Sequence, residues 1–506
     1  MSQTNGVPVS KSGTSLAAPQ QLFISGKYQN SQDEGTFPVK NPMTGETIYE
    51  CVSASLDDYA SAIEEAHAAQ PSWARLGPSS RRLILLKAAD IMETYLDKDA
   101  PAILSAEVSA TRGWVRANIL STAGVFRETA ALATHIKGEI VPADRPGTTI
   151  LVSREPVGVV LAISPWNMPV TLTARAVCCP LICGNSVILR PSEFSPKSQH
   201  LVVRALTEAG LPAGCLQFLP TSAADTPRAI EFAIRHPKVS RANFTGSDRV
   251  GRIIAGLSAS CLKPCVLELG GKAPVVVLED ADVEAAVEAV VYGAMSNSGQ
   301  ICMSTERAIV HRSLAADFKA LLVKRAESLR VGNHLEDPDV QLSGLFTAAS
   351  AERVLGLIKG AVDAGATLLA GDLALHGPCR TILAPHVLTG VTRDMDLFHR
   401  ETFGPVVFVS EFDTDDEAVA QANDSEFSLC ASVFSRDVLR AMDTAKQIRT
   451  GSCHINGPTV YIEAPLPNGG VGGASGYGRF GGVAGIEEFT ERQIVSLARP
   501  GMKYAF

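Results

Sequence analysis

Short apolar runs alternate with amphipathic stretches between about residues 156 and 278. An apolar run of four to eight residues is typical of a buried strand, and a polar cap before an apolar stripe is typical of a helix. The predicted strands are Val157–Ile163, Ser186–Arg190, Leu216–Leu219, Val239–Phe244 and Ala273–Leu278, and the predicted helices begin near Ser195, Thr226 and Ser247. This alternation predicts a parallel sheet with helices on both faces.

A second alternating region extends from about residue 280 to 465. Its expected elements are a helix at Val283–Met295 and strands near Arg307–His311, Val406–Ser410 and Cys430–Phe434. Ahead of both regions, the segment from Ser55 to Asp58 resembles a capping box that opens an amphipathic helix. The glycine-dense segment Gly469–Gly482 predicts a tight, irregular loop rather than a linker.

At 506 residues the chain is too long for one compact core, so we expect two or more domains. Hydrophobic residues make up 46% of it, which argues against general disorder. The 45 basic and 53 acidic side chains are interspersed, and the net charge is −8. Because no run of Lys or Arg could follow a phosphate backbone, we expect neither nucleic acid nor an anionic membrane as a partner.

Targeting and metal-binding signals are weak. No segment reaches the roughly 18 uninterrupted apolar residues of a spanning helix, and residues 1–20 resemble a flexible tail rather than a signal or transit peptide. The 11 cysteines are odd in number and lack the spacing of a disulfide scaffold, which favours a reducing compartment. We therefore expect a cytoplasmic protein with no metal site.

Four short segments contain the candidate chemistry. They are Ile163-Ser-Pro-Trp-Asn167, Leu267-Glu-Leu-Gly-Gly-Lys272, Gly299-Gln-Ile-Cys-Met303 and Glu401-Thr-Phe-Gly-Pro405. In this order and at these separations they resemble the aldehyde dehydrogenase superfamily, and the resemblance covers the chain from about Leu22 to Val495. A single tetrapeptide would be a weak signal, whereas the four together are very specific.

The resemblance implies an α/β fold made of a Rossmann-like cofactor domain, a second α/β catalytic domain and a small β oligomerisation element. The implied ranges are 1–20 for the tail, 21–137 and 156–267 for the NAD-binding domain, 268–466 for the catalytic domain, and 138–155 with 484–506 for the oligomerisation element. Members of the family form dimers or tetramers, so we expect a homodimer or homotetramer. The segment Glu491–Ala498 could supply an edge strand to that element.

The same resemblance assigns three catalytic residues. Cys302 would attack the aldehyde carbon and form a thiohemiacetal, and loss of hydride to a nicotinamide would leave a thioester. Glu268 would be the general base that activates water for hydrolysis. Relatives that transfer the acyl group to coenzyme A generally lack this glutamate, so hydrolysis is favoured. The side-chain amide of Asn167 would stabilise the oxyanion together with the Cys302 backbone N–H.

A dinucleotide site is also implied. Its expected residues are Ile163, Ser164, Pro165, Trp166, Arg190, Ser192, Glu193, Phe244, Gly246, Ser247, Val250, Gly251, Leu269, Gly270, Glu401 and Phe403. Many relatives have Lys where this chain has Arg190. A carboxylate at Glu193 would accept both adenosine ribose hydroxyls and repel a 2′-phosphate, so we expect NAD in preference to NADP, which some members also accept. The helix opened by Ser247 could meet the pyrophosphate.

Several stretches are closer to one subgroup, the salicylaldehyde, vanillin and benzaldehyde dehydrogenases, which points to a (hydroxy)aromatic aldehyde. Arg175, Ile301 and Met303 are the expected substrate-binding residues. The Arg175 guanidinium could meet a phenolic or carboxylate oxygen, or it could be paired with a structural acid. The chain departs from the family at Pro465-Leu-Pro-Asn-Gly-Gly470, beside the expected substrate entrance, where relatives commonly have Pro-Phe-Gly-Gly.

Two other functions remain open at this point. The fold could serve as a non-catalytic dinucleotide-binding or structural protein. Alternatively, the same nucleophile and oxyanion site could support thioesterase or esterase activity without an aldehyde.

Overall fold

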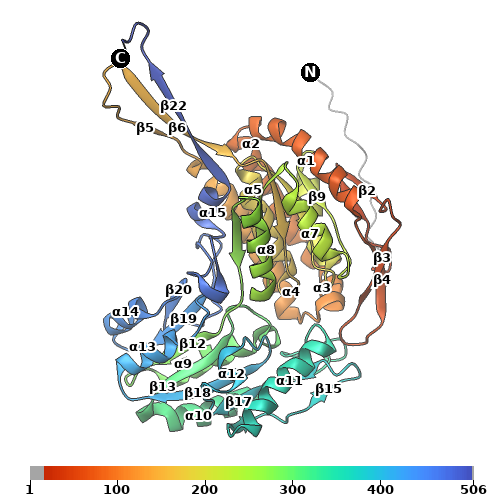
Figure 1. The fold of residues 1–506 in the computed structure, drawn as a ribbon. Coiled ribbons are helices and arrows are strands. Elements are labelled where there is room, and N and C mark those ends of the chain that lie inside the picture. The colour runs from red at the N-terminus through yellow and green to blue at the C-terminus, as the bar shows by residue number, and fades with distance from the viewer. Residues whose placement is uncertain (1–15, 504–506) are drawn as a thin grey trace.

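The computed structural model describes residues 16–503 and contains two parallel sheets and a projecting β arm (Figure 1). The first sheet has eight strands. In spatial order these are β2 (Lys27–Gln29), β1 (Leu22–Ile24), β9 (Leu216–Phe218), β8 (Ser186–Arg190), β7 (Val159–Ile163), β10 (Val239–Thr245), β11 (Cys265–Glu268) and β21 (Gly476–Tyr477). The strands from β9 to β11 are parallel, and the outer pairings are antiparallel.

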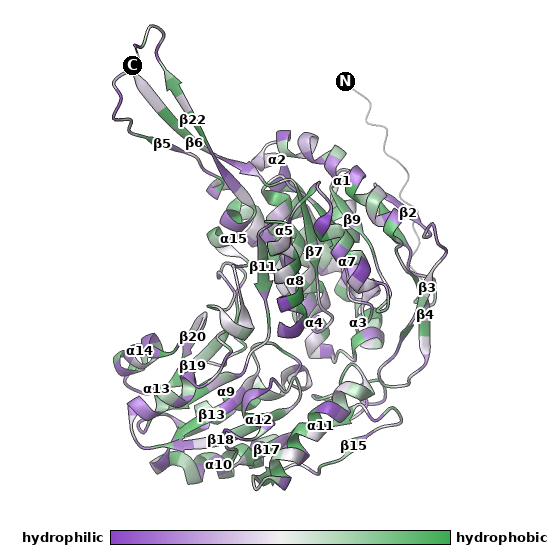
Figure 2. Cartoon of the chain, viewed as in Figure 1, coloured by the Kyte–Doolittle hydropathy of each residue, from purple (hydrophilic) through white to green (hydrophobic). Residues whose placement is uncertain are grey.

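Helices cover both faces of this sheet, as the alternation predicted. In β7, Val160 and Ala162 contribute to one apolar cluster, while Val159 and Leu161 contribute to the other. Strands buried on both faces are continuously apolar, and Figure 2 shows this hydrophobic character in β7 and β11. The helices of the first cluster are α2 (Pro78–Thr94), α3 (Ala100–Val108), α4 (Arg112–Ala131), α5 (Pro169–Ile182) and α6 (Pro196–Ala209), and those of the second are α1 (Leu56–Arg75), α7 (Thr226–Arg235) and α8 (Asp248–Ser260).

The second sheet has seven strands and lies below the first in Figure 1. In spatial order they are β14 (Thr367–Ala370), β17 (His386–Thr389), β18 (Val406–Phe412), β13 (Thr305–His311), β12 (Ala273–Val277), β19 (Cys430–Phe434) and β20 (Ser452–Ile455). All neighbours are parallel except β14 and β17. The helices of this region are α9 (Val283–Met295), α10 (Arg312–Glu327), α11 (Ala348–Asp363), α12 (Asp396–His399), α13 (Asp415–Asn423) and α14 (Val438–Gln447).

The strand β12 corrects one expectation. We grouped Ala273–Leu278 with the first alternating region, but β12 pairs with β13 and β19 in the second sheet. A short apolar run predicts a buried strand without specifying its partners. The α/β fold class itself is confirmed, whereas the domain ranges stay a prediction.

Two local predictions are confirmed. Ser55 caps α1 with its side chain, because its Oγ accepts from the Asp58 N–H at 3.1 Å while Asp58 Oδ2 accepts from the Ser55 N–H at 2.8 Å. The glycine-dense segment Gly469–Gly482 is irregular, and within it β21 completes the edge of the first sheet beside β11.

A three-stranded antiparallel arm projects from the first sheet (Figure 1). It consists of β22 (Thr490–Ala498), β6 (Thr148–Pro156) and β5 (Glu139–Val141), in that order. The remaining strands are β3 (Thr36–Lys40), β4 (Thr47–Val52), β15 (Leu375–His376) and β16 (Ile382–Leu383), and the remaining helix is α15 (Gly482–Glu488). Short 3-10 turns occur at Tyr95–Asp97, Leu132–His135, Ser296–Gly299 and Gly473–Ser475. Residues 1–15 of the expected tail and residues 504–506 lie outside the described range. Among residues 16–503, no helix is both long and apolar enough to cross a membrane.

Candidate active site

Cys302 lies in the short loop between the turn Ser296–Gly299 and β13. This loop leaves regular helix geometry, with φ of 50° at Asn297 and 54° at Ser298. The backbone of the loop packs directly against Gly271, where a Cβ atom would overlap the carbonyl oxygen of Cys302. The second glycine of the Leu-Gly-Gly motif is therefore required for the two loops to meet.

Glu268, the last residue of β11, is brought to the sulfur from the other sheet. Its Oε1 accepts from Cys302 Sγ at 3.7 Å, within the range for a hydrogen bond that involves sulfur. Its Oε2 accepts from an Arg175 guanidinium nitrogen at 2.5 Å. The Glu268 side chain is only 1% exposed and that of Arg175 13%, so this is a buried ion pair adjoining the thiol.

Asn167 follows β7 and also reaches the Cys302 loop. Its Nδ2 donates to the carbonyl oxygen of Gln300 at 3.0 Å. Its own carbonyl oxygen accepts from the Trp114 indole N–H at 2.9 Å and from the Asn297 side-chain amide at 3.1 Å. The three predicted catalytic residues thus lie together. Asn167 is fixed by hydrogen bonds through both its side-chain amide and its backbone carbonyl oxygen.

Cys302 lines the cavity and is partly buried. Burial raises its pKa well above the ordinary value, the carboxylates of Glu268 and Glu401 raise that pKa further, and Arg175 lowers it. A thiol in this setting stays protonated at neutral pH, and only the thiolate is strongly nucleophilic. A neighbouring base must therefore remove the proton as the sulfur attacks, and Glu268 is within reach.

The thiol opens on a cavity of about 370 Å³. Apolar side chains form much of its wall, including Trp114, Leu172, Ile301, Met303 and Phe480. Arg175 is part of this wall and contacts both Glu268 and Phe480, with its guanidinium carbon 5.5 Å from the centroid of the Phe480 ring. All three predicted substrate-binding residues, Arg175, Ile301 and Met303, line the cavity, and Arg175 is paired with Glu268 rather than with a purely structural acid.

The predicted cofactor residues gather at the carboxyl ends of the parallel strands of the first sheet. Ile163, Arg190 and Phe244 lie at or near the ends of β7, β8 and β10. The loops that follow these strands and β11 contain Ser164, Pro165, Trp166, Ser192, Glu193, Gly246, Ser247, Leu269 and Gly270, and the first turn of α8 contains Val250 and Gly251. Ligands of open α/β sheets bind at such an edge, so the placement fits a dinucleotide.

Two details of this edge bear on the fit. Arg190 is buried and donates to Glu193 at 2.9 Å and to the Thr226 hydroxyl at 2.6 Å, while its Nε has no partner among the described residues. Ser247, the N-cap of α8, is exposed, so the first N–H groups of the 13-residue helix begin at a surface-accessible residue. A buried guanidinium with an unused donor and an accessible helix N-terminus suit hydroxyl and phosphate oxygens.

Glu401 and Phe403 reach this edge from the second sheet's region. Glu401 Oε1 accepts from the Gly271 N–H at 3.0 Å, and a Cβ atom at Gly270 would lie 2.5 Å from its Oε2. Burial, together with the nearby Glu306 carboxylate, raises the pKa of Glu401 to about 8. The Phe403 ring contacts Trp166 edge-on, with centroids 5.8 Å apart. Glu401 therefore contacts the loop after β11, and Phe403 contacts the loop after β7.

A family model described as the aldehyde dehydrogenase family matches residues 28–495. The chain belongs to this family.

Among curated aldehyde dehydrogenases, the chain is 46% identical over 476 residues to a vanillin dehydrogenase of a Pseudomonas species, covering 94% of this chain and 97% of that protein. It is 42% identical over 486 residues to a salicylaldehyde dehydrogenase of Pseudomonas putida, covering 96% and 99%. A crystal structure of a salicylaldehyde dehydrogenase from Pseudomonas putida G7 complexed with salicylaldehyde is 41% identical, with a TM-score of 0.93 and coverage of 97% and 100%.

The enzyme class and the cofactor class follow from this membership. The chain is an aldehyde dehydrogenase, and its family uses NAD(P). One similar structure, of PnpE in complex with nicotinamide adenine dinucleotide, is 32% identical with a TM-score of 0.91, covering 96% of this chain and 98% of that one.

Three residues of this aldehyde dehydrogenase site were missed by the sequence analysis. Trp114 binds the Asn167 carbonyl from α4, and Phe346 stacks on Trp166 with ring centroids 3.7 Å apart. Neither belongs to a recognised motif, and both come from segments far from their partners in sequence. Asn468 lines the cavity, and it had a usable signal, because it falls in the segment that departs from the family pattern.

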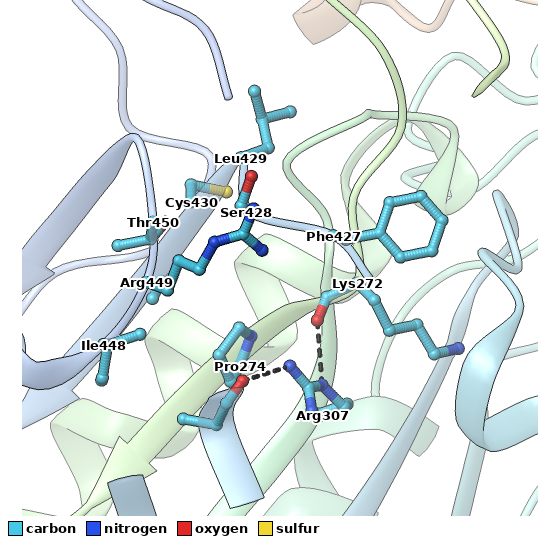
Figure 3. Close-up of a pocket in the computed structure, with 12 residues that line it drawn as sticks. Lys272, Pro274, Arg307, Phe427, Ser428, Leu429, Cys430, Ile448, Arg449 and Thr450 are labelled. Carbon is cyan, nitrogen blue, oxygen red and sulfur yellow. Dashed lines mark hydrogen bonds between the residues drawn. The ribbon is translucent and has the colours of Figure 1, made fainter. Parts of the chain in front are cut away.

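A second, much smaller cavity of about 10 Å³ is lined by Lys272, Pro274, Arg307 and residues 427–431, among others (Figure 3). Arg307 fills this region and donates to the carbonyl oxygens of Lys272 at 2.9 Å and Ala422 at 2.9 Å. The space is about that of one water molecule, so it cannot hold a substrate.

Proposed function

We propose that this aldehyde dehydrogenase oxidises an aromatic aldehyde, hydroxylated on its ring, to the carboxylic acid through a thioester on Cys302. One observation carries the proposal: the Cys302 sulfur is 3.7 Å from the Glu268 carboxylate, at a largely apolar cavity of about 370 Å³. An apolar cavity of this size suits an aromatic ring. The similarity to vanillin and salicylaldehyde dehydrogenases supports the same substrate class.

In the first step, Cys302 Sγ attacks the aldehyde carbon while Glu268 Oε1 accepts the thiol proton. The carbonyl π electrons move to oxygen and produce an oxyanion. Asn167 donates one amide hydrogen to Gln300, and since a carboxamide has two N–H donors, we assign the second to this oxygen, together with the Cys302 backbone N–H. Removal of one such donor typically costs about 10²–10³ in rate.

Oxidation requires a hydride acceptor. Bound NAD supplies this chemistry, because its nicotinamide ring accepts the hydride that leaves the tetrahedral carbon. Glu401, Phe403 and Trp166 would hold the ring near the sulfur, and the residues from Ser164 to Gly251 named above would hold the rest of the dinucleotide. The Glu193 carboxylate, near Arg190 at the end of β8, supports a preference for NAD over NADP.

Hydrolysis completes the cycle. Glu268 first releases the thiol proton to solvent and then takes a proton from water, whose oxygen attacks the thioester carbon. The C–S bond then breaks, the carboxylic acid leaves and the sulfur recovers a proton. Arg175 binds Glu268 Oε2, so Oε1 remains directed to the sulfur.

We also propose that the arm joins copies of the chain. Ile140 is 76% exposed on β5, and Ile494 and Leu497 are 70% and 53% exposed on β22. An exposed β edge with apolar residues favours pairing, which supports a homodimer or homotetramer. All 11 cysteines are free thiols, which supports a cytoplasmic location.

The test is a panel of benzaldehydes and aliphatic aldehydes assayed in parallel with NAD and NADP. We expect reduction of NAD with the aromatic aldehydes and loss of that activity in Cys302→Ala. Full activity of Cys302→Ala would contradict the mechanism. Steady hydrolysis of an aryl ester without NAD, and without oxidation of any aldehyde, would favour the esterase alternative. Dinucleotide binding without turnover of any aldehyde would favour the non-catalytic one.

A further inference from the structure

Asn468 is fixed in the wall of the catalytic cavity by its backbone. Its N–H donates to the Phe480 carbonyl oxygen at 2.8 Å, and the Phe480 N–H donates back to the Asn468 carbonyl oxygen at 2.9 Å. Both residues line the cavity. Because this isolated bridge uses only main-chain atoms, it holds the position of the side chain without depending on which side chain is there.

The side-chain amide of Asn468 is buried without a partner. The residue is 8% exposed, and its Nδ2 has no hydrogen-bond acceptor among residues 16–503. A buried donor left unsatisfied is costly, and the large majority of buried polar atoms in proteins are paired. Rotation of the amide about χ2 would turn this donor to a ligand oxygen in the cavity that the residue lines.

Three other polar side chains of the cavity wall already have partners. Arg175 is paired with Glu268, and Glu463 accepts from the Tyr461 hydroxyl. Thr171 donates to the Asn118 carbonyl oxygen at 2.9 Å. The positive charge of the wall is thus compensated while an acidic side chain, Glu463, adds negative charge, so the cavity suits a neutral polar substituent better than a carboxylate.

We propose that Asn468 forms a polar subsite for a ring oxygen, hydroxyl or alkoxy, of the aldehyde substrate. The inference rests on the proposed function and adds a specificity-determining residue to it. An amide presents both N–H donors and a carbonyl acceptor, and a phenolic oxygen can both accept and donate. Related sequences commonly have phenylalanine in the Pro-Phe-Gly-Gly pattern, so this chain places an amide where an aromatic ring would provide only apolar contact.

The test compares Asn468→Leu with the unchanged enzyme on benzaldehyde and on 2-, 3- and 4-hydroxybenzaldehyde, with saturating NAD. Leucine has nearly the size of asparagine but no polar atom. We expect kcat/KM for the preferred hydroxybenzaldehyde to fall about tenfold, as for the loss of one hydrogen bond, while kcat/KM for benzaldehyde stays within about twofold. Asn30→Leu, at an exposed residue outside the cavity wall, should leave all four values unchanged.

A second variant separates donor from acceptor. Asn468→Asp retains the shape but loses both N–H donors, so 4-methoxybenzaldehyde, whose oxygen only accepts, should lose about as much kcat/KM as in Asn468→Leu. An equal change for all substrates, no preference of the unchanged enzyme for any oxygenated ring, or an Asn468→Leu enzyme with the original preference would overturn the inference. These results differ from failure of the proposed function, in which no benzaldehyde would be oxidised by the unchanged enzyme.

Discussion

Two buried ion pairs lie on either side of the Cys302 loop and have different surroundings. Arg175–Glu268 adjoins the cavity, and Glu268 Oε1 faces the thiol. Lys272–Glu306 is enclosed, with side chains only 1% and 3% exposed. Glu306 also accepts from the Thr402 N–H at 2.9 Å, and Lys272 donates to the Arg400 carbonyl at 2.8 Å.

The first pair, Arg175–Glu268, can exchange a proton with a ligand in the cavity. The second pair, Lys272–Glu306, fixes the backbone around it. Both carboxylate oxygens of Glu306 accept from fixed donors, whereas Glu268 keeps one oxygen beside a sulfur at the cavity. Burial of a charged pair therefore does not identify a catalytic group. Access of one of its atoms to the reacting centre does.

The largest effect on turnover is expected from Glu268→Gln. Loss of a general base lowers rates by about 10²–10⁴, and here the larger loss should fall on thioester hydrolysis, with a smaller loss on acylation because Glu268 also accepts the thiol proton. Stopped-flow assays should show a slowed burst of NADH near one equivalent per site, followed by steady turnover slowed by that factor. Absence of a burst would place the larger loss on acylation instead.

The enclosed pair should instead affect folding. Lys272→Met leaves Glu306 buried without its counter-charge, which costs about 3–5 kcal/mol of unfolding free energy. Chemical denaturation should detect the change as a lower midpoint. If stability were unchanged and only turnover fell, the distinction between the two pairs would be wrong.

The smallest effect is expected on the reactivity of the Cys302 thiol in Arg175→Met, with Arg175→Lys as the matched variant. Arg175 lowers the pKa of Cys302, so its removal raises that pKa further and reduces the thiolate fraction at any pH below it. Inactivation by iodoacetamide should become slower between pH 7 and 9, by less than about tenfold, and the lysine variant should recover part of the rate. Because burial already raises this pKa, the rate should keep increasing with pH across that range in every variant. Faster alkylation in Arg175→Met would contradict the assigned role.

The strand β7 was predictable from the sequence because its five residues include no polar position, and such a run has few other places in a globular protein. The strands β8 and β10 include polar residues, among them Arg190 and Asn243, and were predicted from their place in the alternation of strands and helices. The sheet to which β12 belongs was not predictable, since long-range pairing leaves no local pattern. Cys302, Glu268 and Asn167 came from motif resemblance. The contact of Arg175 with Glu268 joins residues 93 positions apart, and neither spacing nor composition could have selected that acid among 53.

The position of β21 has a consequence for biosynthesis. This strand closes the edge of the first sheet beside β11, the strand that ends in Glu268. Asn468 and Phe480 add their part of the substrate wall only a few residues away in sequence. A chain still emerging from the ribosome, with its C-terminal residues in the exit tunnel, therefore has its nucleophile and base already synthesised but cannot yet enclose an aldehyde.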